Sequence, residues 1–192
     1  MSLYQEQKKI KPKIEDVIPV CLDGDMQDIA LDFVATLRSN KINPSWTLTN
    51  QWKSVCKGKN IFRLSLLPWT PPGKSQNAKW VVTAYLQHLD KYTDIVIAEN
   101  LQSFLFDNVN YCVQKPSNSP PEAAFRQHSF APPCNTWNCA PGKDIIICNQ
   151  KLTNICANGN REYFWFHDPD KNTLNAIIRL LNLERTARLE NK

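Results

Sequence analysis

The residues of this chain with the clearest chemical potential are its seven cysteines, because most of them are clustered. Five fall within one stretch, at Cys112, Cys134, Cys139, Cys148 and Cys156. The lysine-rich segment 1–13 is not followed by an apolar run, so it does not look like an export signal. We therefore expect a cytoplasmic location, where thiols stay reduced and clustered cysteines act as metal ligands more readily than as disulfides.

The expected metal is zinc, which binds four thiolates in a tetrahedron at many structural sites. We predict the ligands Cys112, Cys134, Cys139 and Cys156. Cys112 and Cys134 flank a proline-rich insertion at 113–133, which has few apolar residues to anchor it. A metal ion that holds both ends of this insertion would convert its binding energy into folding energy. The sequence thus predicts zinc as a structural cofactor.

Other roles for these thiols stay open. The cysteines could be unrelated buried thiols, or Cys134 and Cys139 could form a redox or disulfide pair. His128 or Cys148 could replace one of the proposed ligands, although Cys148 ends an isoleucine run and is expected to point into the core. A thiol-dependent enzyme would use a cysteine of the 134–139 segment, for example Cys139 paired with His128. Cys21 and Cys56 are expected to be small buried hydrophobes.

The elements that must position these residues follow from the spacing of apolar side chains. Helical spacing predicts helices over 26–40, with Asp25 as N-cap, over 91–107, and after Asp168, the expected N-cap of the last helix. Alternation predicts an edge strand over 18–22, a hairpin over 45–67, and strands over 80–86, 144–148 and 162–167. The isoleucines of 144–148 are expected to be buried on both faces, and the polar end 185–192 is expected to fray.

These elements predict an α+β fold. The strands between 45 and 86 follow one another through turns, which favours antiparallel pairing. We expect a two-layer sandwich with a mainly antiparallel sheet, about three helices and a long cysteine-containing loop. Residues 1–20 are expected to form a basic tail, and 21–192 a single domain, since 192 residues suit one hydrophobic core.

Composition excludes several classes of protein. Hydrophobic residues make up 42% of the chain and charged residues 21%, which excludes wholesale disorder. No apolar run approaches the ~20 residues that span a bilayer, so no membrane partner is expected. No phosphate loop, dinucleotide fingerprint, nucleophile elbow or zinc-protease motif is present. A small soluble binding module, with a protein or a small molecule as partner, is therefore favoured over an enzyme.

The hairpin at 45–67 offers a nucleic-acid alternative. Lysine and arginine side chains crowd its turn, and two tryptophans lie on the same ribbon: Lys53, Lys57, Lys59, Arg63, Trp46 and Trp52. Interleaved cations and aromatic rings can track phosphates and stack bases. The net charge of +5 is small, however, so we favour the simpler interpretation, in which the tryptophans face the core and the lysines solvate the turn.

Short runs spread over most of residues 20–190 resemble an uncharacterised family of small cytosolic bacterial proteins, a domain of unknown function with a C-terminal cysteine cluster. The runs are Asp23-Gly24-Asp25, Ala30-Leu31-Asp32-Phe33-Val34, Trp46 with Asn50, Trp52 and Lys53, Lys57-Gly58-Lys59, Tyr111-Cys112, Cys139-Ala140-Pro141-Gly142-Lys143, Asn154-Ile155-Cys156 and Asp168-Pro169-Asp170. The resemblance favours the predicted metal site and the predicted architecture, and it implies no particular biochemical activity. Family members have a tighter cysteine cluster, whereas here the insertion 113–133 separates Cys112 from Cys134.

Overall fold

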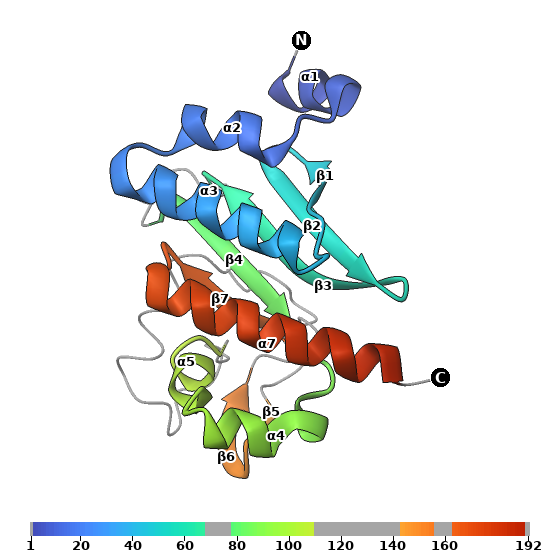
Figure 1. The fold of residues 1–192 in the computed structure, drawn as a ribbon, viewed down its shortest axis with the longest axis vertical. Helices are drawn as coiled ribbons and strands as arrows, with labels where there is room; N and C mark the ends of the chain where they lie inside the picture. The colour runs from blue at the N-terminus through green and yellow to red at the C-terminus, as the bar shows by residue number, and fades with distance from the viewer. Residues whose placement is uncertain (1, 68–77, 110–142, 156–162, 191–192) are drawn as a thin grey trace.

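The fold is built on a five-stranded antiparallel sheet with the strand order β1-β2-β3-β4-β7 (Figure 1). A computed structural model describes residues 2–67, 78–109, 143–155 and 163–190. The strands of this sheet are β1 (Ser45–Leu48), β2 (Gln51–Cys56), β3 (Lys59–Leu66), β4 (Trp80–Tyr85) and β7 (Tyr163–His167). A separate antiparallel hairpin consists of β5 (Lys143–Ile147) and β6 (Gln150–Ile155).

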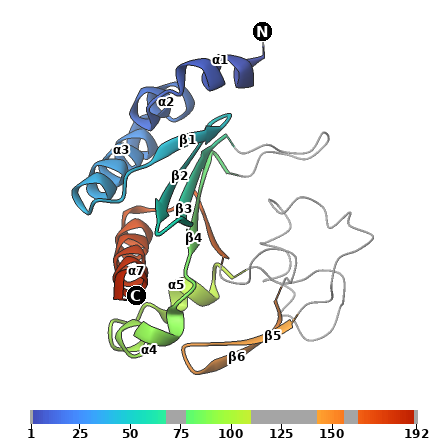
Figure 2. The same cartoon turned by 90° about the vertical axis from the view of Figure 1, so that its right-hand side faces the viewer.

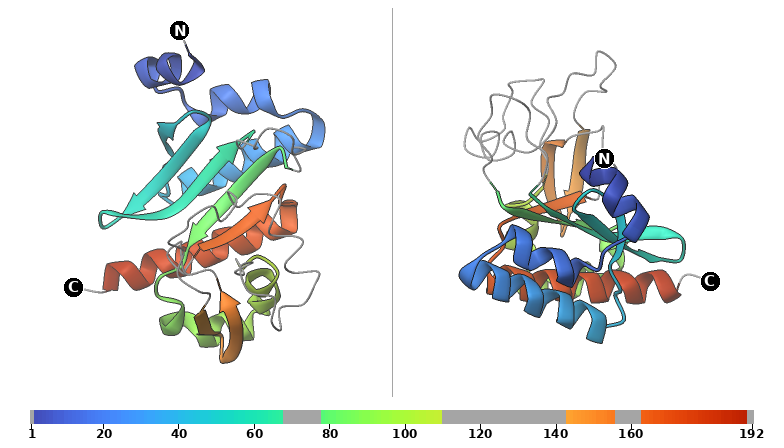
Figure 3. Two further views of the ribbon diagram at one scale, coloured as in Figure 1. Left: turned by 180° about the vertical axis from the view of Figure 1, so that it is seen from behind. Right: turned by 90° about the horizontal axis from the view of Figure 1, so that it is seen from above.

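Helices α3 and α7 cover one face of the large sheet (Figure 2), and they lie behind it when the sheet is viewed from its other face (Figure 3, left). The described ranges contain six helices: α1 (Leu3–Ile10), α2 (Ile14–Cys21), α3 (Gly24–Ser39), α4 (Leu89–Ala98), α5 (Gln102–Phe106) and α7 (Lys171–Glu190). None of these helices combines the length and the apolar character needed to cross a membrane.

The hydrophobic core lies between the sheet and these helices. Alternate strand residues point toward the helices and are fully buried, among them Trp52, Phe62, Leu64, Trp80, Val82 and Phe166. Phe33 of α3 meets the rings of Phe62 and Trp80 in edge-on contacts, with centroids 6.3 and 6.2 Å away. Edge-on contact between rings adds stabilisation beyond the area that they bury. Because side chains alternate along a strand, the residues between these core positions lie on the opposite face of the sheet.

The predicted α+β class and the antiparallel pairing are confirmed. The hairpin at 45–67 is present, but its first half divides at Asn50, whose φ is +53°, so that three strands form a meander. Strands over 80–86 and 162–167 are confirmed as β4 and β7, and the strand over 144–148 as β5. The expected burial of β5 on both faces is wrong, because Ile146 is 76% exposed. The expectation of about three helices is also too low.

The N-terminal segment corrects another prediction. An edge strand was expected at 18–22, but α2 spans most of that range, and Val20 is 82% exposed. The helical spacing of Ile14 and Ile18 explains the difference, because both side chains are fully buried in the core. The first helix, α1, contacts the sheet through Gln7, its buried residue, and through the ring of Tyr4, whose centroid is 6.2 Å from that of Trp46. The Gln7 amide donates to Asn50 Oδ1 (2.7 Å) and accepts from Trp46 Nε1 (3.2 Å).

Three helix boundaries also differ from expectation. The helix expected over 91–107 is two helices, separated at Asn100, whose φ is +55°. Helix α3 begins one residue before Asp25, so Asp25 lies in its first turn and is not the N-cap. Asp168 is not a cap either, because its carboxylate accepts the backbone N–H groups of Lys79 and Trp80. At α7 it is Asp170 that accepts the Thr173 N–H at 2.7 Å.

Candidate functional site

The predicted zinc ligands Cys112, Cys134, Cys139 and Cys156, and the alternative ligand His128, lie outside the described residues, as does the 113–133 insertion. Cys148 is buried as predicted, and burial raises the pKa of its thiol. Cys21 and Cys56 are half-buried and not fully buried, and burial also raises the pKa of Cys21. Within the described ranges, no three His, Cys, Asp or Glu side chains are grouped so that they could hold a metal ion.

The β5–β6 hairpin is the part of the described structure that leads directly to two of these cysteines. Lys143 pairs with Ile155 at the open end of the hairpin, so the chain enters and leaves it at neighbouring points. Cys139 precedes Lys143 by four residues, and Cys156 directly follows Ile155. Four residues span at most about 14 Å. Both cysteines are therefore within a few residues, along the chain, of the same end of the hairpin.

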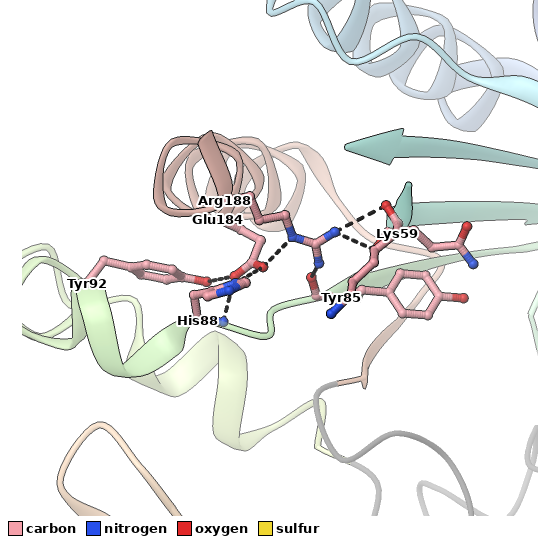
Figure 4. Close-up of polar contacts among 7 residues, drawn as sticks. Lys59, Tyr85, His88, Tyr92, Glu184 and Arg188 are labelled. Atoms are coloured by element: carbon pink, nitrogen blue, oxygen red, sulfur yellow. Dashed lines mark hydrogen bonds and ion pairs between the residues drawn. The ribbon is translucent and has the colours of Figure 1, made fainter. Parts of the chain in front are cut away.

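A buried polar cluster at the C-terminal end of α7 is the most connected group of titratable side chains in the described structure (Figure 4). We call it the α7 clamp, and it consists of Glu184, Arg188, His88 and Tyr92. Glu184 is fully buried, and one of its oxygens accepts Arg188 Nε at 2.6 Å. The same carboxylate accepts the Tyr92 hydroxyl at 2.8 Å and contacts His88 Nδ1 at 2.9 Å.

Arg188 extends the α7 clamp to the sheet. Its guanidinium donates to the backbone carbonyls of Lys59 and Asn60 in β3 at 3.2 and 3.0 Å, and to that of Tyr85 in β4 at 3.0 Å. Burial acts to raise the pKa of Glu184, but the hydrogen bonds from His88, Arg188 and Tyr92 outweigh it, so this pKa is lowered. The Glu184 carboxylate is therefore charged at neutral pH, and the hydrogen bonds of the α7 clamp offset the cost of its burial.

The chemistry of the α7 clamp favours a structural role. A carboxylate that fixes one ring nitrogen of a histidine resembles the base half of a nucleophilic pair. However, no hydrogen bond of the clamp within the described residues involves a serine, threonine or cysteine side chain. Burial and the nearby Glu184 charge raise the pKa of Tyr92, so its hydroxyl stays protonated. The clamp thus joins α7, α4 and two strands without an activated nucleophile.

The second polar assembly is the cationic sheet face, which we define as Lys53, Arg63, Thr83 and Trp165. The strand register places these four residues side by side across β2, β3, β4 and β7, on the face opposite α3. Lys53 stands directly opposite Arg63. Like charges in this position destabilise a sheet. The five strands contain no Asp or Glu that could offset them.

Two hydrogen-bond donors on the cationic sheet face lack a partner among the described residues. They are Arg63 Nε and Trp165 Nε1, and both atoms are buried. In the next row of the same face, His167 pairs with Val81 and its ring meets Trp165 edge-on. Burial lowers the pKa of His167 to about 4, so its ring is neutral at pH 7. This face therefore holds two half-buried cations, a buried indole N–H and a neutral imidazole, and Thr83 between them is 2% exposed.

These findings change the picture of the basic hairpin at 45–67. Trp52 is fully buried on the core side, as the simpler interpretation expected, so it is not available to stack on a base. Lys53 and Arg63 share the opposite face with Trp165, which sequence reasoning did not connect with them. The alternation of Trp52 with Lys53 indicated that they face opposite sides, but nothing local places β7 beside β4.

Comparisons of the chain with models of protein families, with curated proteins and with solved structures found no match. The resemblance to a bacterial family therefore stays a prediction from short sequence runs.

Proposed function

We propose that this protein is a small binding module that takes a phosphate-bearing ligand on the cationic sheet face. The observation that carries the proposal is the cross-strand pair of Lys53 and Arg63, which stands in a sheet whose strands hold no acidic residue. Phosphate oxygens are acceptors only and carry negative charge, so they match the side chains of Lys53 and Arg63, which offer only donors.

The energetics of the unpaired donors support this proposal. Leaving a buried donor without a partner costs about 1–3 kcal/mol, and more if the group is charged. Within the described ranges, Arg63 Nε and Trp165 Nε1 are two buried donors to which this cost applies. An anion that accepted these donors would remove the cost, and it would also relieve the repulsion between Lys53 and Arg63. The face would thus gain most from a ligand that brings negative charge and acceptors together.

The ligand class that we propose is a nucleotide, either free or as a unit of a single strand. Arg63 and Lys53 would hold the phosphate, and the ring of Trp165 would contact the base. The nucleic-acid hypothesis for the hairpin at 45–67 is thus retained for its cations. The aromatic contact, however, becomes Trp165, because Trp52 is buried in the core. The Arg63 and Trp165 positions are separated by two strand spacings, or about 10 Å.

A structural zinc site remains part of the proposal. Cys112, Cys134, Cys139 and Cys156 would bind the ion, and a reducing cytoplasm would keep these thiols available. The open end of the β5–β6 hairpin supports the idea, since it carries Cys139 and Cys156 within a few residues of the Lys143–Ile155 pair. The ion would hold the 113–133 insertion against this hairpin.

The ligand proposal is tested by direct binding of two probes, ATP and a single-stranded ten-nucleotide DNA, to the full chain. Arg63→Gln should weaken binding at least about tenfold, because a charge-assisted hydrogen bond contributes about 1.5–3 kcal/mol. With two phosphate contacts, affinity for the DNA should fall about sevenfold between 50 and 200 mM salt. Binding of ATP alone would assign a free nucleotide, and tighter binding of the DNA would assign a strand.

The matched control is Lys57→Gln, which removes the same charge from the turn of the same hairpin. Lys57 Nζ donates to the Leu189 carbonyl at 3.2 Å and does not belong to the cationic sheet face. We expect Lys57→Gln to change affinity by less than about twofold. Equal losses in both variants, or affinity that does not respond to salt, would contradict a site on this face.

The zinc proposal is tested by elemental analysis of the purified protein. We expect one equivalent of zinc, which is lost in Cys139→Ser and kept in Cys56→Ser, a control with a half-buried thiol. Chelation should lower the melting temperature of the wild-type protein. A single cysteine that reacts fast with alkylating agents in metal-free protein would instead favour the thiol-dependent alternative.

A further inference from the structure

A pocket of about 260 Å³ lies where the β5 strand meets the start of α4. Figure 1 and Figure 3 show the β5–β6 hairpin beside α4. The lining is mainly aliphatic and aromatic and includes Leu86, Leu89, Ile145, Ile147 and Phe164. Gln87 is the one uncharged polar side chain in this lining, and Asp90 is exposed at the start of α4.

We propose that this pocket binds a small two-ring apolar molecule that carries one hydrogen-bond donor. The volume supports the number of rings. An apolar cavity of about 150 Å³ accepts benzene, so a pocket of 260 Å³ has room for a fused bicyclic ring. The lining supports the apolar character, because aliphatic and aromatic walls favour the transfer of a ring from water by about 25 cal/mol for each Å² buried.

Gln87 supplies the reason for the donor. Its Oε1 atom is buried and has no hydrogen-bond partner in the part of the chain that the structure describes, although the whole residue is only half-buried. A buried amide oxygen without a donor is an unfavourable arrangement, and such atoms are uncommon in folded proteins. A ligand N–H or O–H group beside the apolar walls would complete this hydrogen bond. One polar contact in an apolar pocket is also the usual way in which a small ligand is oriented.

The pocket is separate from the cationic sheet face. Phe164 lies in β7 but on the core side of the sheet, opposite Trp165, which alternates with it along the strand. Its lining includes none of the residues that define the cationic sheet face. The inference therefore stands independently of the proposed nucleotide binding.

Two probes of matched shape test the inference. Indole carries a ring N–H, and benzothiophene has the same two-ring outline without a donor. We expect the wild-type protein to bind indole about fivefold more tightly, because a neutral hydrogen bond has a modest net effect. Shifts in protein NMR spectra should map to Gln87, Leu89 and Ile145. Equal affinity for both probes, or shifts that map elsewhere, would overturn the proposal.

Two variants sharpen the test. Gln87→Met keeps the length of the side chain and removes the acceptor, so the preference for indole should disappear while benzothiophene still binds. Leu89→Trp should fill the pocket and abolish binding of both probes. Melting curves check that each variant is folded, and ATP binding should not change in either. Retained indole preference in Gln87→Met would contradict the role assigned to its amide.

Discussion

Two arginines of this protein occupy opposite situations. Arg188 is 3% exposed, and its guanidinium reaches a carboxylate and three backbone carbonyls in the α7 clamp. Arg63 is half-buried on the cationic sheet face, where it stands opposite a lysine and its Nε has no partner among the residues that the structure describes. The first is a charge whose desolvation is compensated within the fold. The second is a charge that stays partly exposed and whose Nε is not satisfied by the described residues.

The comparison separates structural from functional polar groups. A fully satisfied network fixes the elements that it joins, since removing one member leaves another buried and unpaired. A partly satisfied group lowers stability in the free protein, and it persists where binding makes use of it. We therefore expect substitutions in the α7 clamp to change stability, and substitutions on the cationic sheet face to change binding.

The largest effect should come from Arg188→Met. This change leaves the Glu184 carboxylate buried without its main cation, which should lower the free energy of unfolding by about 3–5 kcal/mol. The measurement is urea unfolding of the wild-type and variant proteins at neutral pH. Binding of ATP per folded molecule should stay unchanged, because the α7 clamp shares no residue with the cationic sheet face.

Arg179→Met is the matched control for this prediction. Arg179 lies on the same helix and pairs with Glu99, but their side chains are 45% and 37% exposed. Exposed pairs contribute about 0–1 kcal/mol, so the control should lose at most that amount. Similar losses in both variants would show that the clamp does not hold α7, and the comparison of the two arginines would fail.

A smaller effect should appear in the dependence of stability on pH. Burial lowers the pKa of His167 from 6.5 to about 4, so between these values the unfolded chain binds a proton that the folded protein does not. Stability should therefore fall as the pH is lowered from about 6.5 to 4. The loss is roughly 1–2 kcal/mol after allowance for solvent at this partly exposed ring.

Glu184 titrates in a different range and for the opposite reason. Its folded pKa is lowered because its charged form is hydrogen-bonded, so its contribution is present above its ordinary pKa near 4.5 and is lost as the pH falls through the lowered value. Urea unfolding from pH 7 to pH 3 should show both ranges. His167→Asn should remove the decline above pH 4.5. A decline that survives in this variant would assign that range to another group.

Periodicity could predict the elements whose burial is regular along the chain. Spacing shows which side of an element faces a core, so it predicted the buried stripe of α7, Leu174, Ile177 and Leu181, and the buried β4 strand. Helix α1 could not be predicted in this way. It docks through Gln7, a single glutamine whose partners lie 39 and 43 residues away, and no spacing rule marks such a residue.

The two polar assemblies were only partly predictable. The segment from 185 was expected to fray because it is polar, whereas α7 continues to Glu190 and Arg188 pairs with Glu184 four residues earlier. The packing of α7 against α4 and β3 buries this pair. Lys53 and Arg63 stood out by charge, but Trp165 joins them through the long-range pairing of β4 with β7. Register between distant strands is not encoded in local alternation.

The smallest predicted effect concerns the free protein. If Lys53 and Arg63 repel each other across β2 and β3 without a counterion, Lys53→Gln should raise the free energy of unfolding by about 0.2–1 kcal/mol while weakening ATP binding. A variant that is more stable but binds ATP more weakly would show that Lys53 serves ligand binding and not folding. Added ATP should reverse the order of melting temperatures, because binding stabilises only the protein that binds. If Lys53→Gln lowered stability as Arg188→Met does, the cationic sheet face would be structural, and the contrast between the two arginines would reduce to a difference in exposure.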